Sequence, residues 1–355
     1  MGENMKNQDF SYGRMEINMI YPKYLKKGDV IGIAAPSDGN KRDTDYKRLD
    51  NGKLKLHARG YKVIETASVR TSEKGRSADA ITRAKEFEEL LDNKEVSLIA
   101  SAKGGDFLME MLSKLDFDKV VKNPKWFMGY SDNTSLTYVI TTKCDIATVY
   151  GNNFNDFGMD IWHSSVENSL SILEGKEVVQ NSFDRYEDGF MDRITGLESY
   201  VLEKEVKWRN ISGGNEINMS GRMLGGCLDV LLNLVGTRFD NTKEFLDKYK
   251  KDGFIWYLES FSLDSESISR GLWQLKEAGW FEGAKGFILG RPAFFNEEYY
   301  IPYEEAVLSI LNEMNVPIIL DADIGHKAPQ MTIINGSIGN IYSSNGKGRI
   351  AFNLV

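Results

Sequence analysis

The chain has 355 residues, of which 41% are hydrophobic and 27% are charged, so it can bury a substantial core. This composition excludes a disordered or fibrous protein. The formal net charge is -8, and Lys and Arg are scattered among Asp and Glu, so the sequence has no basic cluster that would bind nucleic acid. We therefore predict no nucleic-acid partner.

Two further features concern the cellular compartment. Cys144 and Cys227 stand far apart in apolar stretches, a pattern typical of free thiols in a reducing compartment. No window is long and apolar enough to cross a membrane, and the N-terminal residues lack the apolar segment of a signal peptide. We therefore expect a cytoplasmic protein without a membrane partner.

Strands and helices alternate in the first part of the chain. Apolar runs predict strands, and the spacing of apolar residues predicts helices between them. The strands are expected at 30–35, 61–65, 97–102, 126–130 and 148–151, and the helices at 43–60, 78–91, 108–115 and after residue 131. This alternation predicts a parallel sheet with helices on its faces, in a first domain that spans residues 1–165.

The remaining chain divides into two parts. Residues 166–215 are polar and aromatic without a clear period, and we interpret them as a connecting segment that covers the substrate, or alternatively as a plain linker. Residues 216–355 predict a second, mixed α/β domain. Its strands are expected at 254–258, 286–290 and 317–320, its helices near 231–234, 268–275 and 303–314, and an antiparallel hairpin at 338–342 and 349–354 around Asn345-Gly346.

Ser131 stands at the corner where the strand Trp126 to Tyr130 runs into a helix. At such a corner the hydroxyl is pushed out of the backbone and lies beside helix N-terminal N–H groups, as in a nucleophile elbow. The plain alternative is that Ser131 caps the helix, which is the commoner role of serine at this position.

Three histidines occupy the chain. His57 and His163 have the setting of surface or half-buried residues, whereas His326 follows a strand and a glycine and is the best candidate for a general base. None is spaced from a Cys, Asp or Glu as a metal ligand would be, and no Gly-x-Gly-x-x-Gly follows a strand. We therefore predict neither a metal nor a cofactor.

Glu259 ends a strand of five apolar residues, where an unpaired buried carboxylate would be costly. It is a candidate partner for the base histidine, and a salt bridge with a nearby Arg or Lys is the alternative. Gly104-Gly105 lies between a strand and a helix. Backbone N–H groups there, together with that of Asp132, could form an oxyanion hole.

With these residues in view, the chain resembles the LD-carboxypeptidase family of serine peptidases, which includes the microcin C self-immunity proteins. The resemblance covers nearly the whole chain, and the motifs occur in the family order. They are residues 28–37, Gly104-Gly105, Gly129-Tyr130-Ser131-Asp132, Gly221-Arg222 with Gly225-Gly226, Trp256-Tyr257-Leu258-Glu259 and Gly325-His326.

The resemblance implies a flavodoxin-like N-terminal domain that carries Ser131 and a C-terminal domain that carries Glu259 and His326. Ser131 would be the nucleophile, His326 the base and Glu259 its partner, in a cleft between the domains. The resemblance also implies a homodimer. The chain departs from the family pattern at three places, so the resemblance does not decide the substrate. They are Cys227 where many relatives have Asn, Lys103 where cell-wall enzymes often have Arg, and Ile334-Asn335-Gly336 after the histidine motif.

Two substrate classes fit this machinery. One is a murein tetrapeptide that loses its terminal D-amino acid, and the other is an aminoacyl sulfamoyl adenylate, which we slightly favour. For the second, Trp162 and Trp208 are hypothetical stacking residues, although each could equally pack against its domain. A hypothesis of another class is a non-catalytic protein that binds peptidoglycan fragments or nucleotides.

Overall fold

The computed structural model describes residues 18–191, 193–296 and 300–354. Six strands form the first sheet, in the order β14-β5-β4-β3-β1-β2. Their bounds are β1 Val30–Ala34, β2 Lys62–Glu65, β3 Val96–Ser101, β4 Trp126–Gly129, β5 Thr148–Tyr150 and β14 Ile333–Asn335. The first five pair in parallel in the order 2-1-3-4-5, which is the flavodoxin-like order, so the predicted fold of this part is confirmed.

Helices cover this sheet. They are α1 Asp43–Ala58, α2 Ala80–Asp92, α3 Met109–Leu112, α4 Phe117–Lys122 and α5 Thr134–Cys144, with short 3-10 turns η1 Ala67–Arg70, η2 Ser131–Asn133 and η3 Phe154–Gly158. Every residue of β1 is buried, as expected for a parallel strand covered on both faces. α2 begins at Asp79, whose carboxylate accepts hydrogen bonds from the N–H groups of Ile81 and Thr82.

Eight strands form the second sheet, in the order β6-β16-β15-β10-β11-β12-β13-β9. Their bounds are β6 Gln180–Asn181, β9 Arg209–Ser212, β10 Glu216–Cys227, β11 Phe254–Glu259, β12 Ala284–Gly290, β13 Ile318–Ala322, β15 Ile338–Ser344 and β16 Lys347–Asn353. β10 to β13 are parallel, and the outer strands pair antiparallel. The expected mixed α/β architecture with an antiparallel portion is therefore confirmed.

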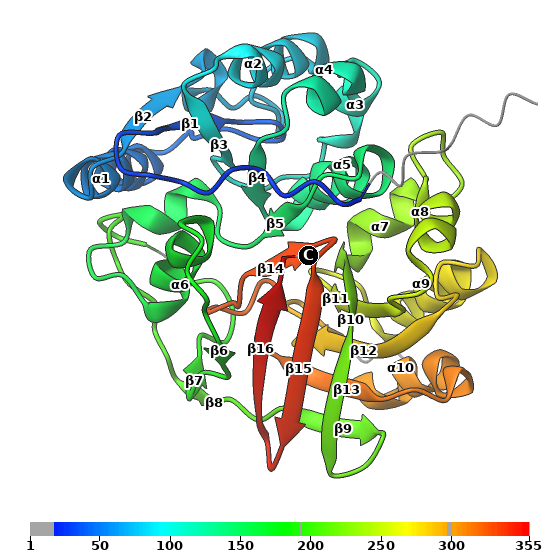
Figure 1. The fold of residues 1–355 in the computed structure, drawn as a ribbon. Coiled ribbons are helices and arrows are strands. Elements are labelled where there is room, and N and C mark those ends of the chain that lie inside the picture. Colours follow the sequence, from blue (N-terminus) through cyan, green and yellow to red (C-terminus); the bar gives the residue numbers. More distant parts are fainter. Residues whose placement is uncertain (1–17, 192, 297–299, 355) are drawn as a thin grey trace, which may run out of the picture.

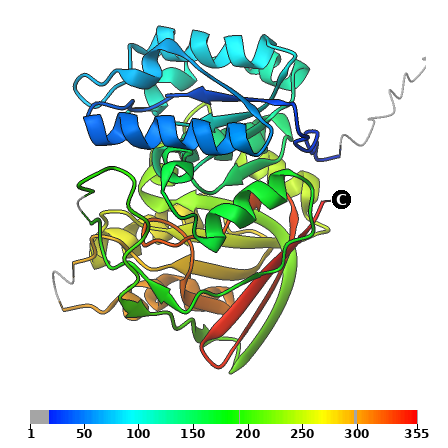
Figure 2. The same ribbon diagram turned by 90° about the vertical axis from the view of Figure 1, so that its left-hand side faces the viewer.

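The helices of this second part are α7 Leu228–Leu234, α8 Thr242–Tyr249, α9 Ser265–Glu277 and α10 Tyr303–Leu311, followed by the 3-10 turn η4 Asn312–Met314. Figures 1 and 2 show the two sheets one above the other, with the first sheet uppermost. One strand of the second half crosses between them: β14 pairs antiparallel with β5, so that Ile333 lies opposite Tyr150.

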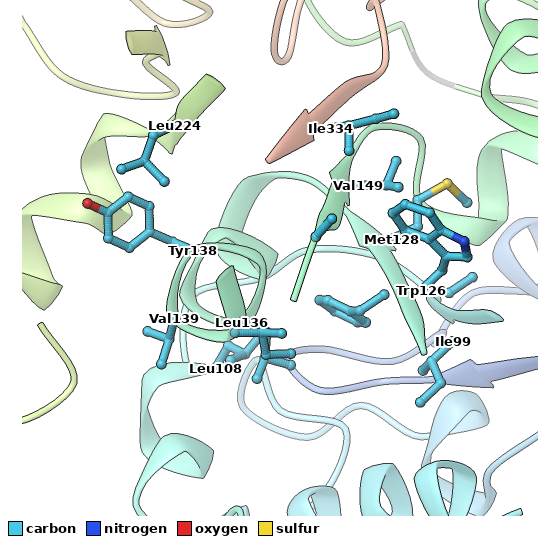
Figure 3. Close-up of a cluster of buried hydrophobic side chains, with 14 of the residues drawn as sticks. Ile99, Leu108, Trp126, Met128, Leu136, Tyr138, Val139, Val149, Leu224 and Ile334 are labelled. Atoms are coloured by element: carbon cyan, nitrogen blue, oxygen red, sulfur yellow. The ribbon is translucent and has the colours of Figure 1, made fainter. Parts of the chain in front are cut away.

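α5, the helix that follows Ser131, lies between the two sheets. All its residues except Lys143 are buried. Figure 3 shows Tyr138 extending toward Leu224 of β10, while Leu136 and Val139 of the same helix lie on the side of Leu108. Burial of nearly the whole helix fixes its first turn, and with it the nucleophile corner, against both halves of the molecule.

The chain between the two halves is more ordered than the sequence indicated. It contains α6 Ser164–Leu173 and a separate two-stranded sheet formed by β7 Arg185–Tyr186 and β8 Lys204–Glu205. In Figure 1 this green segment runs along one side of both halves. Our domain boundaries remain a prediction. Within the described ranges, no helix is long and apolar enough to cross a membrane.

Candidate active site

Ser131 lies at a sharp corner directly after β4. Its φ is 67°, a left-handed conformation that is uncommon for a residue with a side chain and that costs about 1–3 kcal/mol. The backbone N–H of Ser131 donates to the hydroxyl of Tyr150 over 3.3 Å. Its Oγ lies 2.9 Å from Nε2 of His326. The residue that precedes α5 is Asn133, so Ser131 is not the cap of that helix.

His326 lies in the loop after β13 and is 6% exposed. Its Nδ1 lies 2.7 Å from Oε2 of Glu259, the last residue of β11, so the ring joins the serine to the carboxylate. Gly325 has a φ of 95°, and a Cβ there would lie 2.6 Å from Oε2 of Glu259. A glycine before His326 is therefore needed both for the backbone turn and for the space beside the carboxylate.

Two residues support Glu259 on its other sides. The hydroxyl of Tyr150 donates to Oε1 of Glu259 over 2.5 Å, and burial, followed by the charge of Glu259, raises the pKa of Tyr150 well above its ordinary value. Burial also raises the pKa of the Cys227 thiol far above its usual range, with the charge of Glu259 adding to the effect. Sequence reasoning did not single out Tyr150. Its place at the end of a strand next to β4 was the available signal.

The residues expected at the oxyanion site adjoin Ser131. A Cβ added to Gly104 would lie 2.9 Å from the Cβ of Ser131 and 3.0 Å from its Oγ. Within the described chain, no acceptor takes up the N–H of Gly104 or Gly105. The carboxylate of Asp132 accepts from the hydroxyl of Ser37 over 2.5 Å and from the N–H of Leu108 over 2.8 Å. These bonds tie the 104–108 loop to the nucleophile corner.

Burial raises the pKa of Asp132, although the hydrogen bonds from Ser37 and Leu108 act in the opposite direction. The side chain of Asp132 is thus used to hold neighbouring backbone, and only its N–H is available for the oxyanion role.

Aromatic rings surround His326. The ring centroid of Tyr130 lies 5.1 Å, that of Phe261 4.7 Å and that of Phe190 6.3 Å from the imidazole. Phe294 stacks on Phe190 at 5.6 Å. Phe190 is 51% and Phe294 is 53% exposed, so these rings form an accessible rim beside His326.

The two tryptophans chosen from the sequence have the contacts of the packing alternative. Trp208 is 2% exposed, and its Nε1 donates to Asp323 over 3.0 Å. The Nε1 of Trp162 donates to the carbonyl of Phe157 over 2.7 Å, and the guanidinium carbon of Arg59 lies 3.7 Å from the ring centroid. The rings of Tyr130, Phe261 and Phe190 lie next to His326 instead, and Phe190 belongs to the segment that we expected to cover the substrate.

The fold also brings together three groups that sequence spacing did not connect. A ring nitrogen of His326, a carboxylate oxygen of Glu259 and the Sγ of Cys227 lie within 4.8 Å of one another, and such donors can hold a metal ion. His326 and Glu259 are already bonded to each other, and His326 to Ser131. When a hydroxyl, an imidazole and a carboxylate are joined in this order, the imidazole can take the proton of the hydroxyl while the carboxylate stabilises the imidazolium, and we interpret the cluster in this way.

Two models of one protein family match the chain. The model of the LD-carboxypeptidase N-terminal domain matches residues 31–151, and that of the LD-carboxypeptidase C-terminal domain matches residues 220–341. The chain belongs to the LD-carboxypeptidase family. The N-terminal match contains Ser131, and the C-terminal match contains Glu259 and His326.

Individual relatives of this LD-carboxypeptidase family member cover most of its length. It is 28% identical to the microcin C7 self-immunity protein MccF of Escherichia coli over 87% of this chain and 89% of that protein. It is 24% identical to a Bacillus subtilis protein named "Probable murein peptide carboxypeptidase", over 89% of both chains. The structure of MccF in complex with glutamyl sulfamoyl guanosine has a TM-score of 0.76 and 23% identity, covering 94% of this chain and 98% of that one.

Proposed function

We propose that this protein is a serine hydrolase that cleaves an amide bond through Ser131, His326 and Glu259. The observation that carries the proposal is the continuous chain from Oγ of Ser131 to the carboxylate of Glu259, with 2.9 Å and 2.7 Å between successive atoms. Both distances lie within hydrogen-bond range, which is the geometric requirement for a nucleophile, its base and the base's partner.

The steps follow from this geometry. Nε2 of His326 takes the proton from Ser131 as Oγ bonds to the scissile carbonyl carbon, and Glu259 stabilises the imidazolium through Nδ1–H. The N–H of Asp132 and one of the N–H groups of Gly104 and Gly105 bind the oxygen that becomes negative. His326 then protonates the leaving nitrogen, which departs and leaves an acyl-enzyme. A water molecule, deprotonated by His326, attacks the acyl carbon and releases Ser131.

For the substrate we propose an aminoacyl sulfamoyl nucleotide, with a murein tetrapeptide as the second candidate. The first is supported by the 28% identity to MccF and by the accessible rings of Phe190 and Phe294 next to His326, on which a base could stack. The second is supported by the 24% identity to the Bacillus subtilis relative named for murein peptides. Phe190 and Phe294 take the stacking role that we first gave to Trp162 and Trp208.

A mass-spectrometric hydrolysis assay on both substrates tests the proposal, with Ser131→Ala and His326→Ala as controls. We expect cleavage by the native protein, none by either variant, and unchanged activity in the presence of a chelator. Cleavage of the nucleotide alone would identify a detoxifying peptidase, and cleavage of the tetrapeptide a cell-wall recycling enzyme. If neither substrate is cleaved, the hypothesis of a non-catalytic binding protein would be favoured.

The family resemblance also leads us to propose a cytoplasmic homodimer. Light scattering coupled to gel filtration would measure the mass in solution, and a monomer at all concentrations would contradict the proposal.

A further inference from the structure

Arg48 is a buried cation that pairs with no carboxylate in the part of the chain that the structure describes. The residue lies on α1 and is 4% exposed. Its Nη1 donates to the backbone carbonyls of Gly196 and Glu198 over 3.0 Å and 2.9 Å. Its Nη2 is buried and has no hydrogen-bond partner within the described ranges. Arginine is rarely buried to this extent unless it is paired with an anion.

A second guanidinium lies beside the first. Nη1 of Arg193 donates to the same carbonyl oxygen, that of Glu198, over 3.2 Å. Two cations that share one acceptor repel each other. Burial lowers the pKa of Arg48, and the charge of Arg193 lowers it further. In the part of the chain that the structure describes, neither Arg48 nor Arg193 forms an ion pair. We call these two residues the arginine pair.

The nearest carboxylates are used elsewhere. Asp156 and Glu198 are the acidic groups whose charges act on Arg48. Asp156 accepts a hydrogen bond from the amide of Asn152 over 3.4 Å. Glu198 accepts from the N–H groups of Thr195 over 2.6 Å and Gly196 over 3.0 Å. Among the residues that the structure describes, neither carboxylate comes within ion-pair distance of the arginine pair, so no described carboxylate neutralises its positive charge.

The arginine pair lies close to the catalytic centre. Its charges, with those of Asp156 and Glu259, act on the phenol of Tyr130, whose pKa is raised mainly by burial. Tyr130 precedes the nucleophile, and its ring centroid lies 5.1 Å from that of His326. Arg193 is also three positions from Phe190, whose ring lies 6.3 Å from His326. Tyr130 therefore lies against His326 and within reach of the charges of the arginine pair, and Arg193 is close in sequence to the rim at Phe190.

Two other cations stand next to catalytic motifs in the sequence, but both are paired. Lys103 lies 3.4 Å from a carboxylate oxygen of Asp38, and Lys327 lies 2.7 Å from one of Asp188. A negatively charged substrate group would have to compete with these carboxylates. Arg193 is half-exposed, and no carboxylate of the described ranges pairs with it, so the substrate group would meet no such competitor among them.

We propose that Arg193, assisted by Arg48, binds an anionic group on the part of the substrate that leaves with the amide nitrogen. This inference rests on the proposed function, because both candidate substrates carry such a group. A terminal D-amino acid places a carboxylate one carbon from the amide nitrogen, and a sulfamoyl nucleotide places an acidic sulfamate on that nitrogen. A planar guanidinium matches a carboxylate or a sulfamate with paired N–H donors. Arg48 also fixes the backbone of residues 196–198, so it is a positioning residue.

Binding and kinetics of the Arg193→Gln variant test the inference. The probes are a tetrapeptide ending in D-alanine with a free carboxylate, the same peptide as its C-terminal amide, and glutamyl sulfamoyl guanosine. We expect KM for the free carboxylate to rise about 10- to 100-fold, the range for a lost hydrogen bond to a charged group, with little change in kcat. Arg193→Lys should recover part of the loss, and the amide should respond to neither variant.

Arg185→Gln is the matched control. Arg185 lies on the same segment and also donates to a backbone carbonyl, that of Glu203, over 3.0 Å, and we expect its loss to leave KM unchanged. A rise in KM for the sulfamoyl nucleotide alone would identify the sulfamate as the anion, and a rise for the peptide alone would identify the carboxylate. Equal KM values in native protein and Arg193→Gln for both substrates would overturn the inference.

Calorimetric titration of the same probes into Ser131→Ala, with and without Arg193→Gln, separates this inference from the proposed function. If the native protein hydrolyses nothing but Arg193→Gln still weakens binding of the free carboxylate relative to the amide, the triad proposal fails and the anion site stands. If hydrolysis occurs and binding is the same with and without Arg193, the anion site fails and the triad proposal stands.

Discussion

The hydroxyl of Tyr150 donates a 2.5 Å hydrogen bond to Oε1 of Glu259, on the side of the carboxylate away from His326. The same hydroxyl accepts the N–H of Ser131 over 3.3 Å. Tyr150 thus connects the strained backbone of Ser131 with the carboxylate that is bonded to His326, which we propose as nucleophile, partner and base. It lies on β5 of the first sheet, whereas Glu259 ends β11 of the second, so the bond also crosses between the two sheets.

We predict that Tyr150→Phe lowers kcat about 10- to 100-fold, the effect of losing a hydrogen bond to a charged group, and leaves KM nearly unchanged. The reason is that Glu259 and the Ser131 corner lose a shared support while the substrate loses no contact. Steady-state kinetics and thermal unfolding measure the two effects.

Tyr138→Phe is the control for this experiment. It removes another buried hydroxyl, which bonds to Oγ1 of Thr242 over 2.8 Å away from the catalytic groups. Its melting temperature should fall while kcat stays the same. If both variants lose only stability, Tyr150 is a structural residue.

Glu259→Gln should lower kcat by about 10⁴-fold, the scale seen when the acid of a Ser-His-Asp triad is replaced by its amide. An amide can present N–H to the imidazole, which then exposes the wrong tautomer to Ser131, and it cannot stabilise the imidazolium. Circular dichroism should show an intact fold. A rate within tenfold of the native protein would argue against Glu259 as the partner of His326.

The five parallel strands of the first sheet could be predicted because most of their residues are apolar and the helices between them are periodic, whereas β14 was not predicted. β1 and β4 are continuous apolar runs, and the expected strands coincide with the observed ones to within one or two residues. The second part was harder. β10 contains Gly221, Gly225 and Gly226, and glycine is not typical of strands. A Cβ at Gly226 would lie 2.5 Å from Thr134 of α5, so these glycines allow close approach, a requirement that local sequence does not reveal.

α6 was missed for a related reason. Its ten residues include four serines, which are weak helix formers, and it is held by packing of Val166, Leu170 and Leu173. Within the site, the motifs of the family predicted Ser131, Glu259 and His326. The bond from Tyr150 to Glu259 and that from Arg48 to Gly196 join residues 109 and 148 positions apart in sequence, and no periodicity or spacing connects them.

Both cysteines should resist alkylation in the native protein. Burial raises the pKa of Cys144 to about 12 and that of Cys227 well above its ordinary value, so neither forms the reactive thiolate near neutral pH. Intact mass after treatment with iodoacetamide at about pH 8, close to the ordinary thiol pKa, should show no label without denaturant and two labels with it. Labelling of the native protein at Cys227 would contradict its placement against Glu259.

The same shifts predict loss of stability at alkaline pH. A thiol with a raised pKa in the folded state keeps its proton after the unfolded thiol, with a pKa of about 8.5, has lost it, so the free energy of unfolding falls as pH rises above that value. The melting temperature of Cys144→Ala should therefore decline less steeply than that of the native protein between about pH 8 and pH 11. Parallel curves would show that Cys144 does not contribute.

Gly104→Ala tests the oxyanion side of the site. The added methyl group would lie 2.9 Å from the Cβ of Ser131 and 3.0 Å from its Oγ, closer than side-chain carbons normally approach, so the serine must move. We expect kcat to fall at least about 100-fold, the scale of losing one oxyanion donor, with only a small change in melting temperature because Gly104 does not need a left-handed backbone. Gly151→Ala is a suitable control, since the nearest atoms to a Cβ there belong to the side chain of Thr332, at 3.2 Å and beyond. If Gly104→Ala keeps its rate, the loop before Leu108 does not line the path of the reacting carbonyl, and the oxyanion hole must be sought at other N–H groups near Ser131.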